Sequence, residues 1–377
     1  MERKISIGAW NYTPCGFYSA KECVNHWKEL SFSLTLSSAS KGNEEDDKYI
    51  IETLKLCEKE NIKLIVSDES LTFNNLLKIN KDEYEKRVKS KYDLFKKYKS
   101  FYRFLVGDEP HLDEWDNLKI SLSIINKYTV GFLNFLAIDN TINCERWEGV
   151  DLKQYTEMLI DLIKNHGLKM LSFDYYSQCD FYHNQEGINN YIKNLIYYGE
   201  LARENNVFLA CSNLSVGHWS YRVPSIDDIR WQSSLSLALG VDLELWFYLY
   251  ERFFEDNYRL APFDLLKNKT PTHYSLLREN YYLNQIQEKL NGYVLKDYYF
   301  YGNKYKEFNK NNGDLPYILK FKHDGDALLS RFYNKDKHLD VLVNLSLKNI
   351  EEVNIVINGK NVVYHLAPGQ AVIIGEK

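Results

Sequence analysis

Four acidic side chains stand at the ends of apolar runs, where buried strands would reach solvent. Asp108 and Glu109 end one run, Asp139 ends a second and Asp174 a third. Paired carboxyl groups can divide acid and base work, because different surroundings give them different proton affinities. Pro110 cannot donate to a sheet and disfavours a helical Glu109, so the first run must stop there. We expect these carboxylates to lie around one cavity.

Aromatic residues are the second chemical signal, at 15% of the chain with 30 Tyr and 7 Trp. A sugar ring has apolar C–H faces and polar edges, so an aromatic wall with hydrogen-bonding groups suits it. Arg222 is expected to orient a carboxylate through its planar guanidinium. The two-residue period of a strand is expected to put Trp246 and Tyr248 on one face. The residues expected to bind substrate are Trp10, Asp108, Asp139, Tyr175, Tyr176, Trp219, Arg222 and Tyr248.

The overall charge and composition exclude several classes of function. The net charge is −5, whereas a nucleic-acid surface needs a basic excess. Hydrophobic residues are 45% and charged residues 26%, which is typical of a globular protein with an ample core. No apolar run approaches a membrane helix, and the first residues lack the apolar core of a signal peptide. We expect a cytoplasmic protein without nucleic-acid or membrane partners, and the oligomeric state stays open.

Metal and cofactor signatures do not occur in the sequence. The six cysteines form no CxxC pair, and the nine histidines form no HExxH or HxH motif. Free thiols are the expectation for cytoplasmic cysteines. Cys211 ends an apolar run and is expected to be a packed hydrophobe. We expect no bound metal and no cofactor.

Strand-like and helical runs alternate over the first three quarters of the chain. This pattern is typical of β/α units around a parallel sheet, and eight such units make a (β/α)8 TIM barrel. The carboxyl-terminal rim of that barrel is where catalytic residues lie. The predicted strands are residues 5–10, 32–38, 62–67, 101–110, 130–138, 168–173, 207–211 and 243–250, each followed by a helix.

From about residue 292 the runs become short and alternate in polarity. Turn signals such as Asp324-Gly325-Asp326 and Asn358-Gly359 divide them. Their spacing is typical of an antiparallel β-sandwich. The predicted fold is therefore α/β, with a catalytic (β/α)8 barrel over residues 1–294 and a C-terminal β-sandwich over residues 295–377.

Three motifs, in the order expected of the barrel strands, carry a family resemblance. Gly107-Asp108-Glu109-Pro110 resembles the strand-four Asp-Glu-Pro signature of clan-A-type glycoside hydrolases. Residues 171–176, LSFDYY, and residues 222–232, RVPSIDDIRWQ, resemble segments of bacterial hydrolases similar to β-galactosidases. The resemblance implies a glycosidase in which Glu109 is the acid/base.

The chain departs from that family at the end of its seventh strand. The family carries its nucleophilic Glu there, whereas this sequence has Ala210-Cys211-Ser212-Asn213. We expect Asp174 to be the second catalytic group, ionised with help from neighbouring tyrosines, and Glu109 to be the general acid with a pKa raised by its surroundings. Asp108 and Asp139 would hold sugar hydroxyls or raise the pKa of Glu109 by charge repulsion. The separation of Glu109 and Asp174 decides between retention and inversion, and the sequence does not fix it.

Three alternatives remain open at this stage. The missing strand-seven carboxylate is compatible with a non-catalytic carbohydrate-binding protein on a hydrolase fold. An acetamido group of the substrate could replace the second carboxylate, with Asp174 and Tyr175 orienting it. A barrel isomerase or aldolase is disfavoured, because no phosphate-binding glycine loop or inner-strand lysine is found. The sugar, its linkage and exo or endo action stay open.

Overall fold

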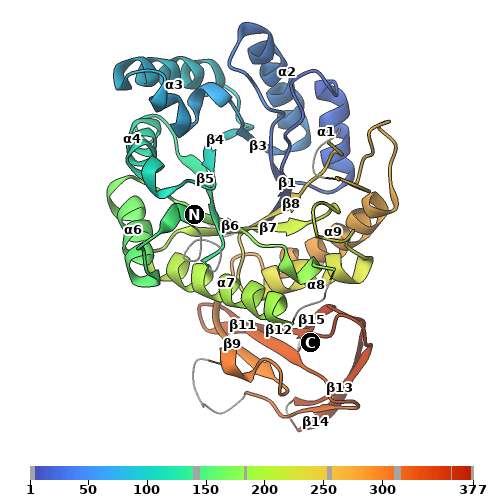
Figure 1. The fold of residues 1–377 in the computed structure, drawn as a ribbon. Helices are drawn as coiled ribbons and strands as arrows, with labels where there is room; N and C mark the ends of the chain where they lie inside the picture. The colour runs from blue at the N-terminus through green and yellow to red at the C-terminus, as the bar shows by residue number, and fades with distance from the viewer. Residues whose placement is uncertain are drawn as a thin grey trace.

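Eight parallel strands form the centre of the larger part of the chain, in the order β1-β8-β7-β6-β5-β4-β3-β2. The computed structural model describes residues 5–138, 145–181, 185–252, 257–309, 316–357 and 359–374. Helices lie around the strands, as in a TIM barrel (Figure 1), so the predicted fold class is confirmed. The units are β1 (Ser6–Ala9), α1 (Ala20–Glu29), β2 (Leu34–Leu36), α2 (Glu44–Glu60), β3 (Lys63–Val66), α3 (Lys81–Phe95), β4 (Phe101–Asp108), α4 (Trp115–Ile125), β5 (Gly131–Leu136), α6 (Leu152–Asn165), β6 (Met170–Asp174), α7 (Gln185–Glu204), β7 (Phe208–Leu214), α8 (Ile226–Ala238), β8 (Leu243–Phe247) and α9 (Pro271–Lys289).

The ring of strands closes between β1 and β2. The Ser33 amide donates to the carbonyl of Ile7 at 2.9 Å, and the Thr35 hydroxyl donates to the carbonyl of Ala9 at 3.1 Å. Gly8 is required at this seam, since a Cβ there would lie 1.9 Å from the Leu34 carbonyl oxygen. Closure leaves no exposed sheet edge and brings the ends of all eight strands to one rim.

The bulge in β4 decides which of its side chains face the barrel interior. The pairing of β4 with β5 shifts between Leu105 and Gly107, so one extra residue is accommodated. A side chain at Gly107 would collide with the Phe73 ring, where an added Cβ lies 2.1 Å from Cε1. Beyond the bulge Asp108 pairs with Asn134. Asp108 therefore enters the barrel mouth on the same side as Leu105.

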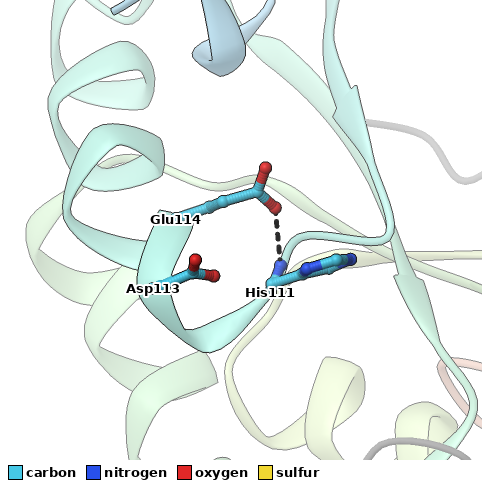
Figure 2. Close-up of side chains that lie close together, drawn as sticks. All are labelled: His111, Asp113 and Glu114. Carbon is cyan, nitrogen blue, oxygen red and sulfur yellow. Dashed lines mark hydrogen bonds between the residues drawn. The ribbon is translucent and has the colours of Figure 1, made fainter. Parts of the chain in front are cut away.

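The turn after β4 holds Glu109 in an uncommon backbone conformation. Glu109 has a φ of +44°, and its amide donates to the carbonyl of Asn134 at 3.0 Å. Two residues on, the His111 amide donates to the Glu114 carboxylate at 2.9 Å and starts the next helical turn (Figure 2). Hydrogen bonds thus fix both ends of the turn. The positive φ of Glu109 is of interest because such backbone conformations at non-glycine residues cluster at functional sites.

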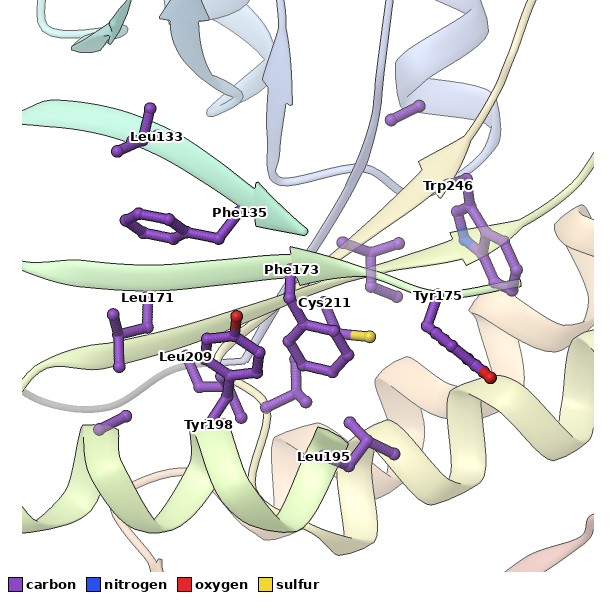
Figure 3. Close-up of a cluster of buried hydrophobic side chains, with 14 of the residues drawn as sticks. Leu133, Phe135, Leu171, Phe173, Tyr175, Leu195, Tyr198, Leu209, Cys211 and Trp246 are labelled. Carbon is purple, nitrogen blue, oxygen red and sulfur yellow. The ribbon is translucent and has the colours of Figure 1, made fainter. Parts of the chain in front are cut away.

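Two apolar layers surround the strands. The outer layer packs between strands and helices and includes Leu171, Phe173, Leu195 and Cys211 (Figure 3). The prediction that Cys211 is a packed hydrophobe is confirmed, as it is fully buried there. The inner layer fills the barrel, with Trp10, Leu36, Ile65, Leu105, Phe132, Met170 and Leu245 among its members. A filled barrel leaves room for chemistry at its mouth and not along its axis.

The C-terminal part is a β-sandwich, as predicted. One sheet has the order β10-β13-β14 and the other β15-β12-β11-β9, and their pairings are antiparallel. The strands are β9 (Val294–Tyr301), β10 (Leu319–Phe321), β11 (Ala327–Asn334), β12 (Lys337–Asn344), β13 (Glu351–Ile357), β14 (Lys360–Leu366) and β15 (Ala371–Ile374). The domain boundary at residue 294 stays a prediction.

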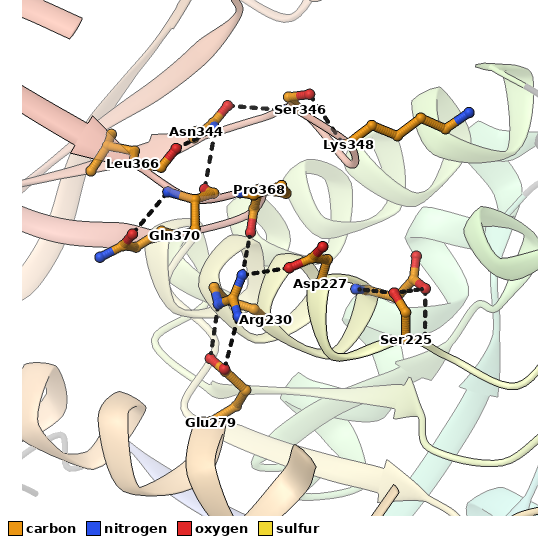
Figure 4. A network of polar contacts seen from close by, with 12 residues as sticks. Ser225, Asp227, Arg230, Glu279, Asn344, Ser346, Lys348, Leu366, Pro368 and Gln370 are labelled. Atoms are coloured by element: carbon orange, nitrogen blue, oxygen red, sulfur yellow. Dashed lines mark hydrogen bonds and ion pairs between the residues drawn. The ribbon is translucent and has the colours of Figure 1, made fainter. Parts of the chain in front are cut away.

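Helix α8 joins the barrel to the sandwich. The Arg230 guanidinium donates to both carboxylate oxygens of Glu279 on α9 and to the carbonyl of Pro368 at 3.0 Å (Figure 4). The Trp231 indole donates to the carbonyl of Leu345 at 3.1 Å. Residues 228–238 of α8 are all buried, which is typical of a helix covered on every side.

Candidate active site

Asn134 on β5 lies between the carboxylates that end β4 and β6. Its side-chain amide nitrogen donates to Asp108 Oδ1 and to Asp174 Oδ1, at 3.0 Å in each case. Its carbonyl oxygen accepts a 2.7 Å hydrogen bond from the Ser172 hydroxyl on β6. Because that hydroxyl fixes which end of the amide faces inward, both N–H groups point at the carboxylates. One buried side chain thus ties two of the predicted site residues together.

Asp174 and Glu109 form a coupled pair at this mouth. The two carboxyl groups share a side-chain hydrogen bond, and the pKa of Asp174 is raised well above its usual range. Burial is the largest cause, followed by the charges of Glu109 and Asp108. These surroundings disfavour the ionised form of Asp174, and its ionised state in the reaction stays a prediction. Two carboxyl groups in contact hold one proton between them, and the titration belongs to the pair.

Asp108, which precedes Glu109 in the sequence, is the third carboxyl group at the mouth. Asp108, Glu109 and Asp174 are called the acidic group below. The Asp108 side chain reaches solvent through the barrel mouth, yet protein surrounds it on the other sides and burial raises its pKa. Hydrogen bonds from Asn134 and Tyr12 oppose that rise. The Tyr12 hydroxyl donates to Asp108 Oδ2 at 2.9 Å, and the pKa of Tyr12 is itself raised by burial and by Asp108. Tyr12 is thus a protonated donor throughout the physiological pH range.

Aromatic rings line the rest of the mouth. Tyr12 stacks on Trp10 with ring centroids 5.5 Å apart, and the Trp10 indole donates to the Ser212 hydroxyl on β7 at 2.8 Å. Tyr176 stacks on Phe247 at 5.2 Å, and the charges of Asp174, Asp108 and Glu109 raise its pKa further after burial. The predicted aromatic wall is present beside the carboxylates, with Trp10, Tyr12 and Tyr176 as its nearest members.

Several predicted residues lie elsewhere. Tyr175 packs in the outer layer between strands and helices (Figure 3), which leaves Tyr176 as the tyrosine at the mouth. The Arg222 guanidinium forms a bidentate ion pair with the Asp228 carboxylate in the first turn of α8. The carboxylate that Arg222 orients is therefore not one of those at the barrel mouth. Trp219 is 60% exposed on the loop after β7. Asp139 lies outside the described residues.

The prediction that Trp246 and Tyr248 lie on one face of the strand is wrong. Trp246 faces the helices, where its indole donates to Asn280 on α9 at 3.1 Å, whereas Tyr248 belongs to the inner layer beside Tyr12. Strand β8 ends at Phe247, so the two-residue period does not extend to Tyr248. The predicted placement of Tyr248 at the mouth nevertheless agrees with its position in the structure.

No carboxylate ends β7, as the sequence indicates. Ser212 faces the interior and Asn213 the helices, where it donates to Glu244 on β8 at 2.6 Å. Glu244 lies in that buried outer network, and burial raises its pKa to about 7. Since Glu244 faces away from the mouth, it does not replace the missing group. Among the described residues, Asp174 and Asp108 are the carboxyl groups that contact Glu109 or adjoin it.

The loop after Glu109 holds the one group in the described ranges with metal-ligand composition. Atoms of His111, Asp113 and Glu114 that could bind a metal lie within 4.8 Å of one another (Figure 2). Glu114 already caps the helical turn through the His111 amide, and Asp113 is exposed. The arrangement is explained by capping and gives no positive sign of a metal site.

Sequence reasoning missed the two residues that organise the site. Asn134 and Ser172 are polar residues inside apolar strands, and each is almost fully buried. Buried polar side chains need hydrogen-bond partners, so a polar residue at an inward strand position was the available signal. Their partners are on other strands, which one sequence does not reveal.

Comparisons with known proteins support the fold. No protein-family model matches the chain, and no curated protein sequence matches it significantly. An endo-β-1,4-mannanase from Thermotoga petrophila has a TM-score of 0.52 at 11% identity, covering 99% of this chain and 98% of its own. A β-galactosidase from Bacillus circulans sp. alkalophilus has a TM-score of 0.55 at 11% identity, covering 77% and 57%. An exo-β-1,4-mannosidase from an Opitutaceae bacterium has a TM-score of 0.51 at 10% identity, covering 76% and 61%.

At these identities the likeness shows the fold alone. The chain spans about three fifths of the β-galactosidase and of the mannosidase, and nearly the whole mannanase. The three solved structures are named as glycosidases. None of the helices in the described ranges combines the length and apolar character that a membrane crossing requires.

Proposed function

We propose that this chain is a glycoside hydrolase that cleaves a glycosidic bond in an oligosaccharide or glycoconjugate. The observation that carries the proposal is the hydrogen-bonded pair of Glu109 and Asp174 at an aromatic barrel mouth. Hydrolysis of a glycoside needs one carboxyl group that holds a proton and one that is ionised. A pair that holds a single proton supplies both protonation states, but its carboxyl groups are in contact. Substrate entry must therefore separate them to about 5–5.5 Å for retention or about 6.5–9.5 Å for inversion. The glycosidase names of the structural neighbours agree with this assignment.

Each residue of the pair has a distinct role in the proposed reaction. Glu109 donates its proton to the glycosidic oxygen as the bond to the anomeric carbon breaks. Asp174, then ionised, attacks the anomeric carbon or takes a proton from the attacking water. The Asn134 amide stabilises the charge on Asp174 and Asp108, because a donor to the ionised form favours that form. Asp108, oriented by Tyr12, binds a sugar hydroxyl.

The first experiment measures nitrophenol release from a panel of α- and β-linked nitrophenyl glycosides. Glu109→Gln and Asp174→Asn are each expected to lower kcat by about a hundredfold or more on the glycoside that the wild type cleaves. Asp113→Asn, an exposed carboxylate on the loop after Glu109, is the matched control and is expected to keep full activity. Full activity in Asp174→Asn would remove Asp174 from the mechanism.

The absence of a carboxylate at the end of β7 favours a second candidate function. Ser212 and Asn213 stand there without a carboxylate, which is compatible with a carbohydrate-binding protein on a hydrolase fold. That protein would cleave no member of the panel. It would also bind sugar as tightly after Glu109→Gln, measured by calorimetry, whereas silence in both assays would exclude both candidates.

A further inference from the structure

A hollow lies beside Tyr12, the residue whose hydroxyl donates to Asp108. Its volume is about 510 Å³, within the range of small-molecule sites. The loop after β1 and the loop after β8 form its walls, with Tyr12, Phe17, Tyr248 and Leu265 among the lining residues. Tyr12 lines this hollow and also donates to Asp108, so the hollow begins where the carboxylates end.

The polar side chains of this hollow are engaged with the surrounding protein. The Thr13 hydroxyl donates to the Asn11 side chain at 2.6 Å. The Glu251 carboxylate is hydrogen-bonded to the backbone at Leu260 and Ala261. The Arg252 guanidinium lies 5.8 Å from the Tyr12 ring centroid, across an aromatic face. A sugar needs hydrogen bonds around its ring edge, and here the lining offers mainly aromatic and aliphatic surface.

The walls of the hollow are tied together. Lys267 donates to the carbonyl of Phe17 at 2.7 Å, and its ammonium lies 5.1 Å from the Phe17 ring centroid. This contact joins the loop after β1 to the segment that carries Leu265. A site whose walls are already connected costs little ordering when a ligand enters.

We propose that this hollow binds an apolar, ring-bearing aglycone, so that the substrate is a glycoside of a hydrophobic alcohol. The inference rests on the proposed glycosidase function, because the carboxylates beside Tyr12 must then act on the bond between the sugar and this group. The sugar lies over the acidic group and the aglycone ring lies between Tyr12, Phe17 and Leu265. Burial of the ring, and not a hydrogen bond, supplies the selectivity.

The direct test uses the alcohol without a sugar. Saturation-transfer NMR is expected to detect 2-phenylethanol on the wild type and to lose that signal in Leu265→Asp, since a charge is placed among apolar groups. Leu266→Asp is the matched control, because Leu266 is 81% exposed and is the next residue in the same loop. Phe17→Ala is a second variant, since Phe17 is 42% exposed and its truncation leaves the core intact.

The second test compares the methyl and 2-phenylethyl glycosides of the sugar that the nitrophenyl panel identifies. Both leaving groups are primary alkyl alcohols, so a difference in binding reports the ring and not the acidity of the alcohol. With Glu109→Gln in calorimetry, the phenylethyl glycoside is expected to bind at least about tenfold more tightly than the methyl glycoside. Leu265→Asp is expected to abolish this preference and Leu266→Asp to keep it.

The outcomes separate this inference from the proposed function. Equal binding of the two glycosides, or equal weakening of both by Leu265→Asp, would overturn the inference while hydrolysis by the wild type still supported the glycosidase. Binding of 2-phenylethanol that depends on Leu265, without hydrolysis of any glycoside, would instead support the hollow and overturn the glycosidase. Absence of 2-phenylethanol binding overturns the inference in either case.

Discussion

The Asn134 amide is the contact whose loss should change the pH dependence of the proposed hydrolysis most directly. Asn134→Ala removes one hydrogen bond from Asp108 and one from Asp174, each 3.0 Å long. A hydrogen bond to a charged group contributes about 1.5–3 kcal/mol, and about 1.4 kcal/mol corresponds to one pKa unit. The amide favours the ionised forms, so its loss should raise the pKa of the carboxyl pair by about one to two units.

The pH profile of kcat/KM measures this change. Its acid limb reports the carboxylate that must be ionised in the free protein, so the limb should move upward by about one to two pH units in Asn134→Ala. Ser172→Ala keeps the amide and removes only the hydroxyl that orients it, and a smaller shift in the same direction is expected. NMR titration of aspartate carboxyl carbons provides a readout that does not depend on turnover.

A buried asparagine outside the mouth gives the control. Asn194 on α7 accepts from the Ile138 amide at 2.8 Å and donates to the carbonyl of Asn190. Asn194→Ala should lower stability without moving the acid limb. If Asn134→Ala lowered activity by the same factor at every pH, and the carboxyl titrations were unchanged, the assigned electrostatic role of Asn134 would be refuted.

Two further changes test the buried charges around the barrel. Glu244 has a pKa raised by burial from 4.5 to about 7, so the stability linked to its protonation is present below pH 4.5 and is lost as pH rises through 7. Glu244→Gln should therefore be more stable than the wild type by about 3 kcal/mol at pH 8 and by little at pH 4.5. Urea unfolding at the two pH values measures this difference, and an equal effect at both would contradict it. Arg222→Ala leaves the Asp228 carboxylate unpaired and should cost about 3 kcal/mol without weakening sugar binding, and the reverse pattern would restore a substrate role for Arg222.

The sequence predicts the strands well because their signals are local. Apolar runs, helix-stop signals and the Glu109-Pro110 step lie within a few residues of one another, and eight strands follow from them. The exact ends of the helices depend on single residues: the last barrel helix begins at Pro271, with Thr270 before it. The Pro at the helix start was the signal that marks this end.

The pairing of side chains across strands is what the sequence does not contain. Asp108, Glu109 and Asp174 were predictable as rim residues, but the Asn134 bridge depends on the β4 bulge, which sets the register against β5. Arg222 illustrates the converse case, since its partner Asp228 lies six residues away and caps the following helix. A local carboxylate is a better partner than a distant one, because little chain entropy is lost in reaching it.

The coverage of α8 on two sides has a consequence for synthesis on the ribosome. Trp231 and Arg230 obtain their last partners, Leu345 and Pro368, from residues translated more than a hundred positions later. At a synthesis rate of about 5–20 residues per second, the residues that cover the outer face of α8 are added on the order of ten seconds after the helix itself. During that interval Arg230 and Trp231 lack these partners, and the sandwich that follows supplies them.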